Sequence, residues 1–190
     1  MPHPDFPPEP WQSLLEVGKL PLREAVQACL RLPHDFLIIT TGAHPLPLCV
    51  RELGLPRVDV CRYFPSHSQL PVPCSKRTAF SDDALYSSYG SLLWDAEEAV
   101  MQIMRQHLLE HGDCAHAHHP FACVLNCQHG LHRSQATARF LAETWAFRGS
   151  SSCVLNASTF HRQWCDPCFR VLEKPPNDAS VYLGIPQPVG

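Results

Sequence analysis

The sequence predicts a single α/β domain in which a mostly parallel sheet is flanked by helices. Short apolar runs alternate along the chain with segments of helical periodicity, and this alternation is typical of parallel sheets. The length of 190 residues suits one domain with short tails, and 45% hydrophobic residues supply a core. We therefore expect a Pro-rich tail at residues 1–10, the domain at 11–172 and a second Pro-rich tail at 173–190.

Four short runs are predicted to form the strands. Each run is rich in β-branched, aromatic or cysteine side chains and is bounded by turn-forming residues, which is the pattern of a buried strand. The runs are Phe36–Thr41, Arg57–Cys61, Phe121–Asn126 and Cys153–Ala157. Because a ligand of such a sheet lies beyond the carboxyl ends of its strands, the residues after each run are the first candidates for a site.

Three segments carry apolar residues at helical spacing. Trp11–Leu32 is predicted to contain one or two short helices, Ser91–His111 a long helix, and Gln135–Phe147 a helix closed by a glycine. Residues 62–80 hold several prolines and many polar groups, so we expect an irregular surface loop there.

Charge and composition exclude several classes of function. The net charge of −3 and the presence of only three lysines give no global attraction to nucleic acid or anionic lipid. The apolar runs are far shorter than the ~20 residues that cross a bilayer, and the first residues resemble no export signal. We expect a cytoplasmic protein without a membrane partner, and most of its ten cysteines as reduced core thiols. Nothing indicates a cofactor or an oligomeric state.

Two segments contain metal-ligating residue types. Asp113–His119 is rich in histidine but lacks paired ligand spacing, so we interpret it as a solvated connector. Cys165-Asp166-Pro167-Cys168 has the spacing of a redox or zinc motif without a second pair. We predict no metal site, and the role of this Cys-x-x-Cys segment stays open.

The most informative segment is VLNCQHGLHRS, residues 124–134, where a strand leads through a glycine-containing loop into a helix. The amides of such a loop and the positive end of the helix dipole favour an oxyanion such as phosphate. Arg133 can bind two phosphate oxygens at once through the hydrogen-bond donors of its planar guanidinium group. Cys127 lies in the same positive field, which favours its thiolate form. The alternative is that Cys127 is a core thiol and Arg133 a surface residue of the helix.

Further residues are candidates for the same anion site because neighbouring strand ends converge at one edge of a sheet. Those beyond Cys127 and Arg133 are His129, Gly130, His132, Ser134, Asp59, Arg62, His161 and Arg162. For His161-Arg162 the alternative is a surface pair in a loop, and for Asp59 it is the cap of a turn.

The Cys127-x5-Arg133-Ser134 pattern resembles the signature loop of cysteine-dependent protein phosphatases, especially the dual-specificity type. That resemblance implies that Cys127 is the nucleophile, that Arg133 holds the phosphate and that Ser134 helps the thiol to leave. The general acid of that family is an aspartate, for which the chain offers Asp82, Asp83, Asp95 and Asp113.

Residues 36–172 resemble the C-terminal domain of the bacterial RNase adapter RapZ and its relatives. The matching segments are FLIITTGAHPLP, VDVCRYFPSH, the helix at 91–111, FACVLNCQHGLHRS and CVLNASTFHR. The Walker-type motif of that family's nucleotide-binding lobe is absent, so the resemblance implies the C-terminal module standing alone. It implies a binding module for a phosphorylated sugar-like metabolite, with RNA as a further partner. The phosphatase is the alternative function.

Overall fold

The computed structural model describes most of the predicted domain. The described residues are 20–31, 34–42, 46–64, 79, 82–111, 121–159 and 181–184. The predictions for residues 1–10, for the first half of the helical segment at 11–32, for most of the loop at 62–80 and for the connector at 113–119 lie outside these ranges, as do His161, Arg162 and the Cys165–Cys168 segment.

A five-stranded sheet forms the centre of the fold, with strand order β2-β3-β1-β4-β5. The strands are β1 (Phe36–Gly42), β2 (Arg57–Asp59), β3 (Phe121–Cys127), β4 (Ser152–Asn156) and β5 (Val181–Gly184). Strands β2, β3, β1 and β4 are parallel, and β5 pairs antiparallel with β4. The structure thus confirms the predicted α/β fold with a mostly parallel sheet.

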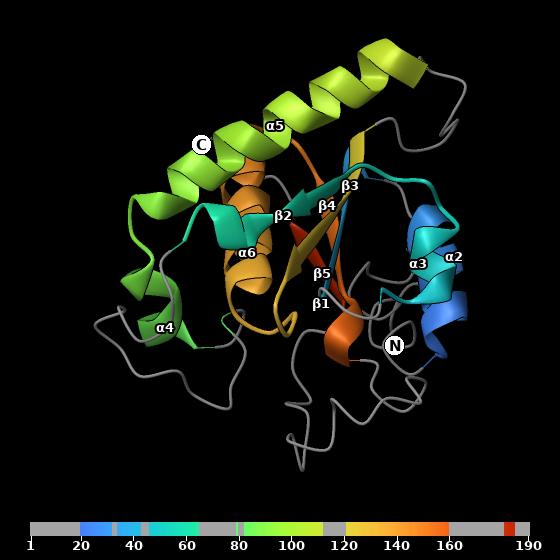
Figure 1. The fold of residues 1–190 in the computed structure, drawn as a ribbon, viewed down its shortest axis with the longest axis horizontal. Coiled ribbons are helices and arrows are strands. Elements are labelled where there is room, and N and C mark those ends of the chain that lie inside the picture. Colours follow the sequence, from blue (N-terminus) through green and yellow to red (C-terminus); the bar gives the residue numbers. More distant parts are fainter. Residues whose placement is uncertain are drawn as a thin grey trace, which may run out of the picture.

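Helices cover both faces of this sheet (Figure 1). They are α2 (Leu22–Arg31), α3 (Leu48–Arg51), α4 (Asp83–Ser88), α5 (Leu92–His111) and α6 (Arg133–Phe147), with the short 3-10 turns η1 (Val60–Arg62) and η3 (Ala157–Thr159). Alternate residues of β1 point to opposite layers. Leu37 and Ile39 pack with α2 and α3, whereas Ile38 packs with α4, α5 and α6. The continuous apolar runs in the sequence therefore reflect strands that are buried on both sides.

The connections from the two central strands leave toward opposite faces of the sheet. The chain after β1 runs to α3, which packs in the layer of α2, while the chain after β3 enters α6 in the other layer. Gly42 and Cys127 are partners in the register of β1 and β3, so this divergence occurs directly beside Cys127. Such a switch point at the carboxyl ends of parallel strands is where open α/β sheets bind ligands.

Three elements differ from the sequence predictions. β2 ends at Asp59 rather than at Cys61, because the Asp59 side chain accepts a hydrogen bond from the Cys61 amide at 3.1 Å and starts η1. Helices α3 and α4 were not predicted, since each is too short to show periodicity. The expected tail at 173–190 contains β5, whose Val-Tyr-Leu run has strand-forming side chains despite the flanking prolines.

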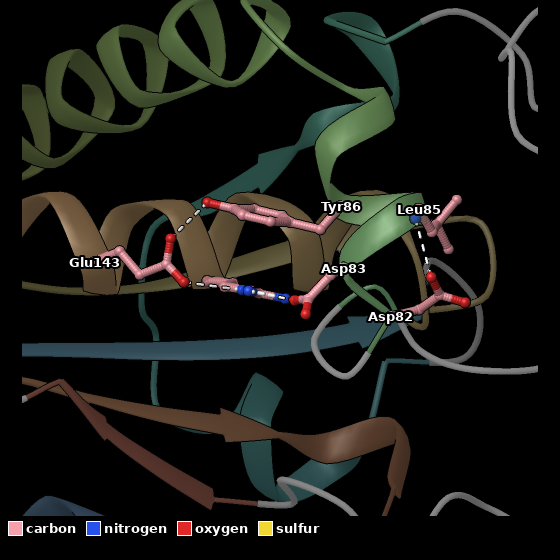
Figure 2. Close-up of polar contacts among 6 residues, drawn as sticks. Asp82, Asp83, Leu85, Tyr86 and Glu143 are labelled. Carbon is pink, nitrogen blue, oxygen red and sulfur yellow. Dashed lines mark hydrogen bonds and ion pairs between the residues drawn. The ribbon is translucent and has the colours of Figure 1, made fainter.

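A cluster of polar side chains connects α4 to α6 through an ion pair and a hydrogen bond (Figure 2). The Arg139 guanidinium lies between Asp83 Oδ1 at 2.7 Å and Glu143 Oε1 at 2.9 Å. It also stacks over the Tyr86 ring, 4.1 Å from its centroid, and the Tyr86 hydroxyl donates to Glu143 Oε2 at 2.8 Å. Asp82 caps α4 by accepting from the Leu85 amide at 3.0 Å. This cluster holds the start of α4 against the middle of α6.

Tyr86→Phe is expected to reduce stability by about 1 kcal/mol, the value of a hydrogen bond to a partly exposed charged group.

Burial and the neighbouring Glu143 carboxylate raise the pKa of Tyr86 above its ordinary value of about 10. The folded state therefore holds the phenol proton more tightly than the unfolded state. The protonated Tyr86 phenol contributes its full stabilisation below about pH 10, and this stabilisation is lost as the pH rises toward the folded-state pKa. Urea unfolding at a series of alkaline pH values should show a smaller loss of stability above pH ~10 for Tyr86→Phe than for wild type. An equal pH dependence in both proteins would contradict this.

Two features of the described residues concern membrane and metal binding. Within these ranges, none of the helices is long and apolar enough to cross a bilayer. The same part of the chain contains no group of three or more His, Cys, Asp or Glu side chains placed to hold a metal ion.

Candidate functional site

The loop Cys127–His132 joins the end of β3 to the start of α6, where the sequence predicts an anion site. Gly130 adopts a φ of +71°, a backbone conformation that is strained for a residue with a side chain. A Cβ atom at this position would overlap Ser158 Oγ and the backbone nitrogen of Gly42. The loop therefore packs closely on the end of β1 and on the turn after β4, and only glycine fits at its centre.

Cys127 lies at the base of this loop and is 2% exposed. The Gly130 amide donates a hydrogen bond to Cys127 Sγ at 3.2 Å. Cys127 Sγ and Ser134 Oγ are also 3.2 Å apart, a contact in which either atom can donate. The residues that the phosphatase resemblance assigns to nucleophile and leaving-group assistance are thus in direct contact.

Gln135 fixes the orientation of the loop, a role that sequence analysis did not find. Its side-chain amide nitrogen donates to the Gly130 carbonyl oxygen at 3.0 Å, and the whole side chain is buried in the first turn of α6. This contact holds the peptide after Gly130 in one orientation. The only available signal was its position one residue after Arg133-Ser134, at the start of the predicted helix.

Arg133 begins α6 and is 7% exposed, so its guanidinium does not extend into solvent. Its Nε atom is buried without a hydrogen-bond partner. Among the described residues, Arg133 takes part in none of the ion pairs, which involve Arg23, Arg139 and Arg148. A buried guanidinium without a counter-charge is costly, and such groups concentrate at functional sites.

Two buried hydroxyls on the elements that pack against Gly130 are also unpartnered, and that of Ser158 lies directly beside this glycine. Ser158 Oγ, in η3 after β4, and Thr41 Oγ1, at the end of β1, have no hydrogen-bond partner within the described structure. The Ser158 hydroxyl and the Thr41 carbonyl carbon are among the atoms closest to the position that a Cβ on Gly130 would occupy. Sequence analysis missed both residues, although each directly follows or ends a predicted strand. Together with Arg133 they supply hydrogen-bond donors that the protein itself does not use.

The segment after β2 packs against the same loop. Turn η1 contacts β3 and α6, and Cys61 packs against the core cluster that contains Cys127. Burial raises the pKa of the Cys61 thiol, an effect that the Arg133 charge and the Gln128 amide oppose. Asp59 caps η1, as its alternative interpretation proposed, and Arg62 is exposed at the end of that turn.

The remaining predicted residues are placed differently. His129 is exposed in the loop, whereas the His132 side chain is 7% exposed at the N-cap of α6. Asn126, which precedes Cys127, is buried and accepts a hydrogen bond from Arg57 Nε at 2.7 Å. Turn η1 lies against β3 and α6, but Asp59 and Arg62 are exposed, and His161 and Arg162 are outside the described residues.

Comparisons of the chain with protein-family models, with curated proteins and with solved structures find no match.

Proposed function

We propose that the loop Cys127–Ser134 binds the phosphate group of a small phosphorylated molecule, and that the protein acts as a binding module. The buried, unpaired guanidinium of Arg133 is the observation that carries this proposal. A phosphate dianion would supply both the missing counter-charge and an acceptor for Nε. The resemblance to the RapZ C-terminal domain leads to the same class of ligand.

The surroundings of Arg133 support an anion rather than a neutral ligand. The 15-residue helix α6 begins at Arg133, so its positive dipole end and its first free amides face the segment that contains the loop. The unpartnered hydroxyl of Ser158 adds a neutral donor beside Gly130, and a second unpartnered hydroxyl belongs to Thr41 at the end of β1. All these groups lie at the switch point between β1 and β3, where the fold itself favours ligand binding.

Titration calorimetry with inorganic phosphate and with a small phosphate monoester tests the proposal. Arg133→Ala is expected to weaken binding by about 100-fold, because a charge-assisted contact is worth up to ~3 kcal/mol. Arg139→Ala is the matched control: it removes the same charge from the same helix but from a residue paired with Asp83 and Glu143. Equal affinities of the Arg133 and Arg139 variants would refute the proposal.

The alternative function is a cysteine-dependent phosphatase. It is favoured by the contacts of Cys127 Sγ with the Gly130 amide and the Ser134 hydroxyl, which suit a nucleophilic sulfur and its later departure. The described aspartates suit it less. Asp82 caps α4, Asp83 pairs with Arg139, and Asp95 is exposed on α5.

An assay with a small aryl phosphate separates the two functions. We expect wild type to bind the aryl phosphate without turning it over, because Cys127 is buried and the described aspartates are engaged or exposed elsewhere. Cys127→Ser serves as the control for any activity that is seen. Turnover by wild type that the serine variant lacks would establish the phosphatase and exclude the module that only binds.

A further inference from the structure

The outer surface of α5 and α6 presents large aromatic side chains to solvent. Trp94, in the first turn of α5, is 54% exposed, and Phe147, at the end of α6, is 88% exposed. Phe140 lies two helical turns before Phe147 and therefore on the same face of α6. Because large aromatic side chains are mostly buried in a folded domain, several exposed ones on adjoining helices indicate a surface that binds a partner.

Contacts between the two helices join these side chains into one surface. The Trp94 ring packs edge-on against Phe140, with 4.8 Å between the ring centroids and 81° between the ring planes. One turn further along α5, Glu97 Oε1 accepts a hydrogen bond at 2.7 Å from Nη1 of Arg148, the residue after Phe147. We call the surface made by Trp94, Phe140 and Phe147 the aromatic face. Both contacts restrict side chains before a partner arrives, which lowers the entropy cost of binding.

Carboxylates border the aromatic face and outnumber the arginines there. Asp95 and Glu98 are exposed on α5, and among the described residues neither takes part in an ion pair. Glu98 lies beside Trp94 because residues four apart are neighbours on a helix. The two arginines that adjoin the face on the α6 side, Arg139 and Arg148, already pair with carboxylates. The aromatic face therefore combines apolar rings with negative charge that the described residues do not neutralise.

We propose that the aromatic face binds an arginine-bearing segment of a partner protein. A guanidinium can stack on the Trp94 ring and donate hydrogen bonds to the Glu98 carboxylate at the same time, because its planar group suits both contacts. Apolar residues of the same segment would cover Phe147. A second copy of this chain docked through the same face, a nucleic acid or an anionic lipid surface would each bring negative charge to these carboxylates, and repulsion disfavours all three.

This surface is separate from the proposed phosphate loop. Arg133 begins α6 next to that loop, whereas Phe147 ends the helix about 20 Å further along its axis. A partner on the aromatic face therefore needs no phosphate in the loop, and either property can be lost without the other. The aromatic face thus adds a second binding surface to the one proposed for phosphate.

The test titrates two synthetic peptides into the full chain by calorimetry. One peptide is an amphipathic helix of leucine and arginine, and the other has glutamate in place of every arginine. Trp94→Ala removes the aromatic ring, and Glu98→Lys reverses one exposed charge. Leu109→Ala is the matched control, since Leu109 is 83% exposed at the far end of the same helix. Thermal melting shows whether each variant is folded; Glu98→Lys carries the test if Trp94→Ala is not.

We expect wild type and Leu109→Ala to bind the arginine peptide equally, and neither to bind the glutamate peptide. Trp94→Ala should weaken binding by about tenfold or more, as for an aromatic hot spot, and Glu98→Lys by about fivefold or more. Wild type that binds neither peptide, or both equally, would overturn the proposal, as would unchanged affinity in the folded variants of the face. Self-association in analytical ultracentrifugation that Glu98→Lys or Trp94→Ala abolishes would assign the face to a second copy and overturn it too.

Discussion

Gly130→Ala is expected to destabilise the protein by about 3 kcal/mol or more, and to abolish phosphate binding. One part of this effect is backbone strain, because alanine at a φ of +71° costs about 1–2 kcal/mol. The larger part is steric. The new methyl group would overlap Ser158 Oγ and the Gly42 backbone nitrogen, and a backbone atom inside a sheet cannot move away cheaply.

Gly149→Ala provides the control for backbone strain alone. Gly149 has a φ of +86°, and a Cβ there would meet no atom within 4 Å. Urea unfolding should therefore show a loss of about 1 kcal/mol for Gly149→Ala and a clearly larger loss for Gly130→Ala. Equal losses would mean that the loop can separate from Ser158 and Gly42 without cost, which contradicts the close packing described above.

Arg133→Met is expected to stabilise the phosphate-free protein by about 1–2 kcal/mol while removing its response to phosphate. Methionine has a similar length and helix propensity, and it removes a buried charge that no described carboxylate balances. For a chain of this size, such a gain raises the melting temperature by about 2–8 °C. Phosphate should raise the melting temperature of wild type only, since a ligand stabilises the state that binds it.

Arg139→Met is the comparison variant because it removes two ion pairs instead of an unpaired charge. It should lower the melting temperature in the absence of phosphate and preserve the upward shift when phosphate is added. Destabilisation of Arg133→Met by more than about 1 kcal/mol would show that the Arg133 guanidinium is already well partnered in the unliganded protein.

The buried strands and the long helices were the parts of the fold that the sequence predicted best. Continuous apolar runs such as Phe36–Thr41 and the regular spacing of α5 leave only one way to bury their side chains. Local side-chain hydrogen bonds decided the errors. The Asp59 cap ends β2 earlier than predicted. The Asp82 cap starts α4, a short helix that was not predicted, ahead of the long helix predicted from Ser91. β5 forms only through pairing with β4, a contact that its own residues do not encode.

The candidate site was predicted where its residues adjoin in sequence and missed where the fold assembles them. Cys127, Gly130, Arg133 and Ser134 share one strand–loop–helix segment, so their proximity could be predicted. Thr41 and Ser158 reach Gly130 only through the order of β3, β1 and β4, which sequence periodicity does not determine. Their hydroxyls are buried donors whose lack of a partner is visible only in three dimensions.

The most direct test of the phosphate site is a crystal of the protein soaked with tungstate, a tetrahedral oxyanion that anomalous scattering locates without ambiguity. We predict one strong peak, with oxygens within hydrogen-bonding distance of the Arg133 guanidinium and of amides in the loop 127–134, and no peak at this position in Arg133→Met. A peak elsewhere, or an empty loop at a saturating concentration of tungstate, would contradict the proposal that this loop binds phosphate.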